Sequence, residues 1–187
     1  MEIVTMYEQL GVSRAVYEYG EAVLRDLRPR FDVIDQTAEY NQGKVLAAMQ
    51  KNRVNATHFA ATTGYGYNDD GTLTSDDYRY ASTTVTLRNL EDTAVPVWTP
   101  VLYDFALRND DGTLDMVRTG YDLDFEATGD TVPSDDPQHV VIAPGGTVQL
   151  TMVRVLPTYV LESDNLVLVP TDNGSLFSHA FALGRQM

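Results

Sequence analysis

The chain has 187 residues, of which 43% are hydrophobic, so it suits one folded domain with a buried core and is not a disordered chain. It carries 27 acidic residues against 13 basic ones, a net charge of −14, which would repel a phosphate backbone and excludes nucleic acid as an expected partner. It has no cysteine, hence no disulfide framework or thiolate metal site, and no apolar run approaches the roughly 18 residues of a membrane span.

The first 72 residues predict a helical N-terminal arm of two helices. Ser13 is a candidate N-cap, and the apolar residues that follow it recur at three- and four-residue spacing until Pro29. A second helical pattern runs from Asp32 to about Asn52. Residues 60–77 are then rich in turn-forming residues.

Residues 78–187 predict short strands separated by turns. The pattern of Asn109-Asp110-Asp111-Gly112 is typical of a hairpin turn, and residues 128–138 predict a polar loop. The predicted strands are Ser82–Leu87, Val95–Leu107, Thr113–Tyr121, His139–Ile142, Thr147–Met152, Leu166–Val169 and Leu176–Leu183. We therefore expect a mainly β fold, an antiparallel β-sandwich that is immunoglobulin-like or jelly-roll-like, preceded by the helical arm.

The pattern does not determine the register of the predicted strand that begins at Thr147. Alternation places Val148, Leu150 and Met152 on one face, but Arg154 shares their parity while its neighbours are apolar. Either the inward face ends at Met152 or a bulge intervenes.

No constellation of catalytic or metal-binding residues is found. The string NDDGTL occurs at residues 68–73 and 109–114, and its carboxylates could suggest calcium, but the spacing of a helix-loop-helix calcium loop is absent and a hairpin turn is favoured. His58, His139 and His179 are too scattered for a metal pair. We expect no catalytic residue and no metal site.

Three aromatic residues, Trp98, Tyr103 and Phe105, fall in one predicted strand. Such a cluster can stack on sugars or partner proteins, but burial in the core is the favoured interpretation.

Residues 16–71 carry an ordered set of short motifs. They are Glu39-Tyr40-Asn41-Gln42, Lys44-Val45-Leu46, Arg53-Val54, His58-Phe59 and Thr62-Thr63-Gly64-Tyr65-Gly66-Tyr67-Asn68-Asp69. This set resembles the N-terminal region of the aluminium-resistance proteins, which are similar to methionine γ-lyases and cystathionine β-lyases. The resemblance implies the cofactor pyridoxal phosphate, with Gly64, Tyr65, Gly66 and Tyr67 helping to hold its phosphate.

The sequence departs from that family in two respects. The arginine that the family places soon after the NDxG glycine is missing, since Thr72-Leu73 follow Gly71 and Arg79 comes too late. No lysine occurs after Lys51, so a Schiff-base lysine in a following cofactor domain is absent. These departures predict that the chain alone has no lyase activity.

Residues 80–171 weakly resemble immunoglobulin-like accessory domains of microbial surface proteins, through Val85-x-Leu87-x-Asn89, Tyr103-Asp104-Phe105-x-Leu107, Asp110-x-Gly112 and Ala143-Pro144-Gly145-Gly146-Thr147-Val148. The leading hypothesis is a non-catalytic interaction or structural protein, such as a surface-layer or virion subunit, that binds a protein partner or itself. The alternative is a truncated or fused relative of the pyridoxal-phosphate lyases. The N-terminus shows no secretory signal, so a cytoplasmic protein or an assembled particle is expected.

The composition also suggests adaptation to salt. Short, strongly hydrated aspartates dominate the acidic residues, and Lys44 and Lys51 are the only lysines. A salt-loving source and an ordinary acidic protein are both compatible with this pattern.

Overall fold

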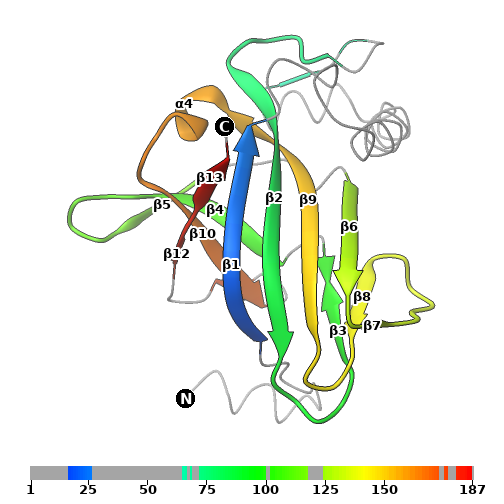
Figure 1. Ribbon diagram of the computed structural model, residues 1–187. Helices are drawn as coiled ribbons and strands as arrows, with labels where there is room; N and C mark the ends of the chain where they lie inside the picture. The colour runs from blue at the N-terminus through cyan, green and yellow to red at the C-terminus, as the bar shows by residue number, and fades with distance from the viewer. Residues whose placement is uncertain are drawn as a thin grey trace.

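The computed structural model describes residues 17–26, 65–66, 68, 72–99, 102–117, 124–172, 175–176 and 180–186. These residues form a mainly β structure with several antiparallel sheets and one short helix (Figure 1). The elements are β1 (Tyr17–Asp26), β2 (Tyr78–Asn89), β3 (Val95–Trp98), β4 (Tyr103–Arg108), β5 (Leu114–Met116), β6 (Asp124–Gly129), β7 (Thr131–Val132), β8 (His139–Ile142), β9 (Thr147–Pro157), α4 (Thr158–Leu161), β10 (Leu166–Asp172), β11 (Ser175–Leu176), β12 (Phe181–Ala182) and β13 (Gly184–Gln186).

The largest sheet has the strand order β13-β1-β2-β9-β6. Its neighbours pair antiparallel except for β1 and β13, which run parallel. In Figure 1 the N-terminal strand β1 lies between β2 and the C-terminal strand β13. The sheet therefore joins segments from both ends of the described chain.

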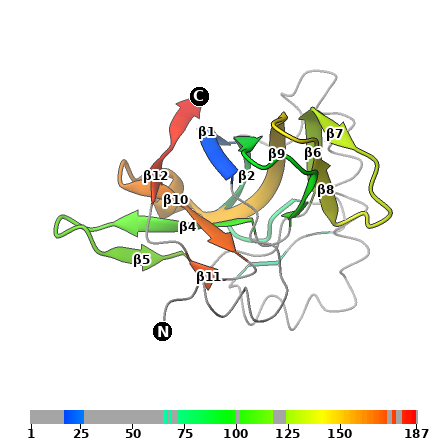
Figure 2. The same cartoon turned by 90° about the horizontal axis from the view of Figure 1, so that it is seen from below.

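Two smaller sheets complete the fold. One has the order β11-β10-β4-β5, with β12 also paired to β10, and the other has the order β3-β8-β7. Figure 2 shows β4, β5, β10 and β11 gathered on one side of the molecule, with β7 and β8 beside β6. The chain passes from the first sheet to the third at the β6–β7 corner.

One hydrophobic cluster unites the three sheets. In β2 from Ala81 onward and in β9 up to Met152 the buried side chains alternate with half-buried or exposed ones, as expected where β-branched and aliphatic residues cover one face of a sheet. The cluster includes Val85, Leu87, Leu150 and Met152 of the first sheet, Tyr103, Phe105 and Leu168 of the second, and Val97 and Ile142 of the third.

The first predicted helix is wrong, because residues 17–26 form strand β1. Helical spacing would bury Val23, but the buried residues are Ala22 and Leu24, with exposed Glu21 and Arg25 beside them. That is a two-residue period, and pairing with β2 overrides the local helical pattern. The second predicted helix, at residues 32–52, lies outside the described residues.

Several predicted strands are confirmed. His139–Ile142 is β8, and the Asn109–Gly112 turn joins the antiparallel strands β4 and β5. The predicted strand Val95–Leu107 is two strands in different sheets, β3 and β4. Residues 128–138 are not entirely loop, since they contain the end of β6 and all of β7.

Within the described ranges, no helix is long and apolar enough to cross a membrane.

Candidate functional site

The Gly/Tyr motif is described at Tyr65, Gly66 and Asn68, whereas Gly64 and Tyr67 lie outside the described residues. The Gly66 carbonyl accepts hydrogen bonds from the Thr74 N–H at 2.9 Å and from Thr74 Oγ1 at 3.1 Å. The Asn68 N–H donates to the Thr72 carbonyl at 2.7 Å. These bonds bring Thr72 and Thr74 beside Asn68 and Gly66.

Tyr65 contacts the first residue of β2. Its side chain is only 3% exposed, and its ring lies 5.5 Å from the ring of Tyr78 at an angle of 49°. A tilted aromatic pair of this kind stabilises packing. The Tyr65 ring is therefore part of the protein interior. That Gly64, Tyr65, Gly66 and Tyr67 hold a cofactor phosphate stays a prediction.

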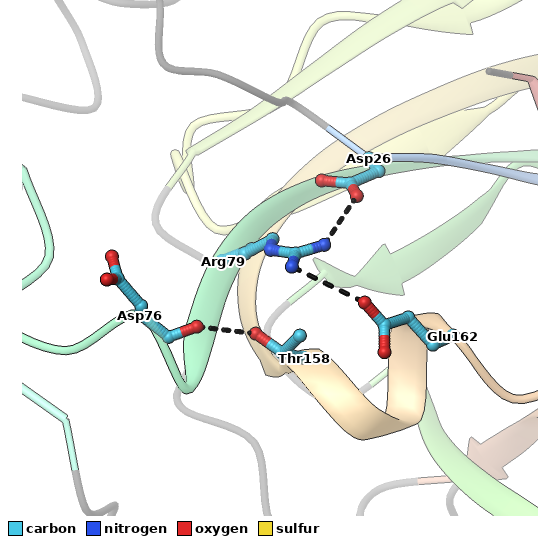
Figure 3. A network of polar contacts seen from close by, with 5 residues as sticks. All are labelled: Asp26, Asp76, Arg79, Thr158 and Glu162. Carbon is cyan, nitrogen blue, oxygen red and sulfur yellow. Dashed lines mark hydrogen bonds and ion pairs between the residues drawn. The ribbon is translucent and has the colours of Figure 1, made fainter.

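A polar cluster lies where β1, β2 and α4 meet (Figure 3). Arg79 Nη1 is 3.4 Å from Asp26 Oδ2, and Arg79 Nη2 is 3.4 Å from Glu162 Oε1. Thr158, the first residue of α4, donates its hydroxyl to the Asp76 carbonyl at 2.8 Å (Figure 3). The guanidinium thus joins the end of β1 to the residue that follows α4.

This cluster contains the arginine that comes nearest to the one missing from the family pattern. Arg79 is the first arginine after the motif, but its guanidinium is occupied by two carboxylates of its own chain. Its side chain is 21% exposed, so the pair with Asp26 is partly shielded from water. Partly exposed pairs of this kind contribute roughly 1 kcal/mol or less each, which makes the cluster a modest structural clamp.

A second arginine is buried in the core. Arg154, only 2% exposed, places its guanidinium carbon 4.5 Å from the ring centroid of Tyr103 and 5.8 Å from that of Phe105. Its Nη1 lies 3.5 Å from Asp104 Oδ1. The aromatic faces and the carboxylate together compensate a charge that arginine cannot lose.

The position of Arg154 answers the register question. The pairing of β9 with β2 runs from Thr147 to Pro157 in one continuous register, so Arg154 stays on the inward face with Met152. Val153 and Val155 are buried on the opposite face. The inward face continues past Met152 without a bulge, and the sheet is covered on both faces at this end.

The aromatic cluster of the sequence is confirmed as core for two of its members. Tyr103 and Phe105 are fully buried and contact each other edge to face, with centroids 5.4 Å apart. The side chain of Trp98 lies outside the description.

Among the histidines only His139 is described. Its Nδ1 lies 2.9 Å from Asp136 Oδ2 in an exposed turn. The hydrogen bond from the Gln138 N–H holds the pKa of the Asp136 carboxyl below its ordinary value; desolvation opposes this effect, and His139 adds smaller contributions that lower the pKa. Over the described ranges, no group of three or more His, Cys, Asp or Glu side chains could hold a metal ion.

The second NDDGTL string forms a self-contained turn. Asp111 Oδ1 accepts hydrogen bonds from Thr113 Oγ1 at 2.6 Å and from the Thr113 N–H at 2.9 Å, which lower the pKa of this carboxyl. Gly112 has φ of 85°, a conformation that favours glycine. The carboxylate therefore stabilises a hairpin, in agreement with the turn interpretation.

Comparison with known proteins gives one family match. The family model described as methionine gamma-lyase matches residues 16–126. An uncharacterized protein of Bacillus subtilis (strain 168), YnbB, is 45% identical over 66 residues, which are 35% of this chain but only 16% of the Bacillus protein.

Among solved structures, one titled "The unique CBM- of Ruminiclostridium thermocellum" aligns with 60% of this chain and 93% of its own, with 12% identity and a TM-score of 0.22. This similarity is too distant to assign a function.

Proposed function

The chain belongs to the methionine gamma-lyase family, and from that premise we propose that it is a non-catalytic member, an interaction or assembly protein built on a β-sandwich. The observation that carries the proposal is the distribution of lysine. Lys44 and Lys51 are the only lysines, and both lie in the segment between strands β1 and β2, outside every described strand. An enzyme that uses pyridoxal phosphate needs a lysine beside the cofactor to form a Schiff base.

The described charged side chains near the motif support the same reading. Arg79 pairs with Asp26 and Glu162, and the Tyr65 ring is packed against Tyr78. These contacts stabilise the fold, and none of them places a reactive group in an open site.

The strand arrangement supports a sandwich, immunoglobulin-like or jelly-roll-like, as the scaffold. The cluster that contains Leu150, Phe105 and Ile142 lies among three sheets. Single acidic β-sandwiches of this size serve as building blocks of surface layers and virions, and this is the class of assembly that we propose. The partner is a second protein or another copy of the chain.

Size-exclusion chromatography with light scattering, over a series of protein concentrations and salt, tests this function. Concentration-dependent association supports it. A protein that stays monomeric at every concentration of protein and salt would contradict self-assembly. Binding to a different protein would then be tested by pull-down with that purified protein.

The second candidate function, a truncated or fused lyase relative that keeps the phosphate-side loop, is favoured by the family match alone. Absorbance during titration with pyridoxal phosphate tests it, with Lys44→Arg and Lys51→Arg as the matched variants. We expect no band of a protein-bound Schiff base. A saturable band that either variant removes would reverse the order of the two candidates.

A further inference from the structure

The exposed turn that leads into β8 contains the only Asp-Pro peptide bond of the chain, between Asp136 and Pro137. The side-chain carboxylate of an aspartate can attack the carbonyl carbon of its own residue, because the attack closes a five-membered ring and needs no encounter with a second molecule. Proline weakens the bond that has to break, since its nitrogen has no hydrogen and carries two alkyl groups, which make it more basic. This bond is therefore reactive before the fold contributes anything.

Two donors hold the carbonyl oxygen of this peptide bond. The oxygen of Asp136 accepts hydrogen bonds from the His139 N–H at 3.1 Å and from Ser134 Oγ at 3.0 Å. Donors at such distances stabilise the negative charge that develops on a carbonyl oxygen when a nucleophile adds to its carbon, and one donor contributes roughly a hundredfold or more in enzymes. A β-turn needs only the first of these bonds, so the Ser134 hydroxyl is an addition to the ordinary turn.

Two further groups hold the carboxylate of Asp136. Its Oδ1 accepts the Gln138 N–H at 2.8 Å, and its Oδ2 lies 2.9 Å from His139 Nδ1. The hydrogen bond from Gln138 lowers the pKa of this carboxyl, which favours the ionised form that acts as a nucleophile. A protonated histidine beside it is a source of the proton that the departing nitrogen requires.

The turn is anchored to a buried residue and is still open to water. Thr99 is only 1% exposed, and it donates both its N–H and its hydroxyl to the Gln138 carbonyl at 3.1 Å. His139 is the first residue of β8, whereas residues 134–138 are exposed. The fold thus holds the reacting groups in place and leaves the bond accessible to the water that completes a hydrolysis.

We propose that the protein cleaves its own chain between Asp136 and Pro137. A carboxylate oxygen of Asp136 adds to the carbonyl carbon of the same residue, the C–N bond to Pro137 breaks, and the nitrogen leaves with a proton from the His139 imidazolium. The products are a cyclic anhydride at Asp136 and a new N-terminus at Pro137. Water opens the anhydride to two carboxylates, and of the two protons released one returns to the imidazole and the other protonates the new amine. The net reaction is the hydrolysis of one peptide bond.

The cut leaves the fold intact. It falls between β7 and β8, which remain paired through Thr131 with Ile142 and Val132 with Val141. The reaction takes place once in each chain and acts on no other molecule, so it is compatible with a non-catalytic assembly protein. It does not depend on that proposed function.

Incubation of the purified full chain at about pH 6, followed over days by denaturing electrophoresis and mass spectrometry, tests the proposal. We expect the fragments 1–136 and 137–187, formed at least about tenfold faster in the folded protein than in the same chain unfolded in urea. Added hydroxylamine should trap the anhydride as a hydroxamic acid at Asp136. A contaminating protease would not produce that group.

Variants of the turn separate its parts. Asp136→Glu and Pro137→Ala should abolish the cleavage, and Ser134→Ala and His139→Gln should slow it about tenfold or more. The matched control Asp135→Asn removes a neighbouring exposed charge and should leave the rate unchanged, and thermal melting verifies that each variant is folded. Equal rates in the folded and unfolded chain, no fragments at all, or cleavage that persists in Asp136→Glu would each overturn the proposal.

Discussion

At the scale of single residues, Arg79 and Arg154 differ in what they contribute to the fold. Arg79 lies at a junction of three elements and is partly solvated, whereas Arg154 is enclosed between β9 and the aromatic side chains of β4. A buried guanidinium is more costly to desolvate, so its shape and stacking matter as much as its charge.

Replacing Arg154 by methionine should therefore be tolerated better than replacing it by alanine. Methionine fills most of the volume against Tyr103, and we expect a loss within about 1 kcal/mol, whereas Arg154→Ala leaves a cavity and should cost about 2–4 kcal/mol. Urea unfolding measures both, with exposed Arg25→Ala as the control. Equal losses for the two Arg154 variants would show that charge, and not shape, determines the contribution.

Asn89 is a second buried polar residue with a distinct role. Its Nδ2 donates to the carbonyls of Thr93, Ile142 and Ala143 at 2.8, 3.2 and 3.0 Å, and its Oδ1 accepts from the Glu91 N–H at 2.9 Å. The fully buried amide thus ties the end of β2 to the β8–β9 turn.

The variant Asn89→Asp should be strongly destabilised at neutral pH, by about 2–4 kcal/mol, because a buried carboxylate would face carbonyl oxygens. Burial and these oxygens would raise the pKa of the new carboxyl in the folded state. The loss relative to wild type should then shrink as the pH falls and the carboxyl becomes a donor. Melting curves at several pH values measure it, and a pH-independent difference would contradict this account.

At the scale of elements, the β6–β7 corner depends on one glycine. Gly129 has φ of 123°, and a Cβ at this position would collide with the carbonyl oxygen of Thr147. Gly112 also has positive φ, but a Cβ there would meet open space. Comparing the two glycines therefore separates the energetic cost of an unfavourable backbone conformation from the cost of a steric clash.

We expect Gly129→Ala to cost about 3 kcal/mol or more and Gly112→Ala only about 1 kcal/mol, because the second change strains the backbone without a clash. Chemical denaturation of both variants measures the difference. Similar losses would mean that the corner relaxes and that the close approach to β9 is not required.

The elements also show which parts of the fold the sequence can predict. Asn109–Gly112 is recognisable because its turn chemistry is local, and β8 is bounded by turn residues on both sides. Strand β1 is not recognisable, since Val23 and its apolar neighbours fit a helical spacing until β2 is alongside. Its conformation is determined by a partner far along the chain, which local patterns do not contain.

In the candidate site, too, some features could be predicted from the sequence and others could not. The motif around Tyr65 is visible in the sequence, but the burial of the Tyr65 ring against Tyr78 is a contact with β2 that the local pattern does not contain. The parity of Arg154 with Met152 was the available signal for a buried arginine. The stacking of Arg154 on Tyr103 could not be predicted from the sequence, because β4 and β9 belong to different sheets.

At the scale of the whole molecule, the net charge of −14 should make stability depend on salt. Mutual repulsion among carboxylates opposes the compact state, and mobile ions screen it over about 10 Å at 0.1 M ionic strength and about 3 Å at 1 M. We therefore expect the melting temperature to rise from low to molar sodium chloride. Calorimetry in a salt series measures it, and a protein equally stable without salt would contradict adaptation to salt.

The parallel contact of β1 with β13 has a consequence for how the protein is made. Strand β1 leaves the ribosome before either of its two neighbours in the sheet, which contain residues 78–89 and 184–186. Because translation adds only about 5–20 residues per second, β1 waits for several seconds before the sheet around it can close. Its apolar side chains stay exposed meanwhile, and a nascent chain stalled before residue 184 would leave that edge open to chaperones.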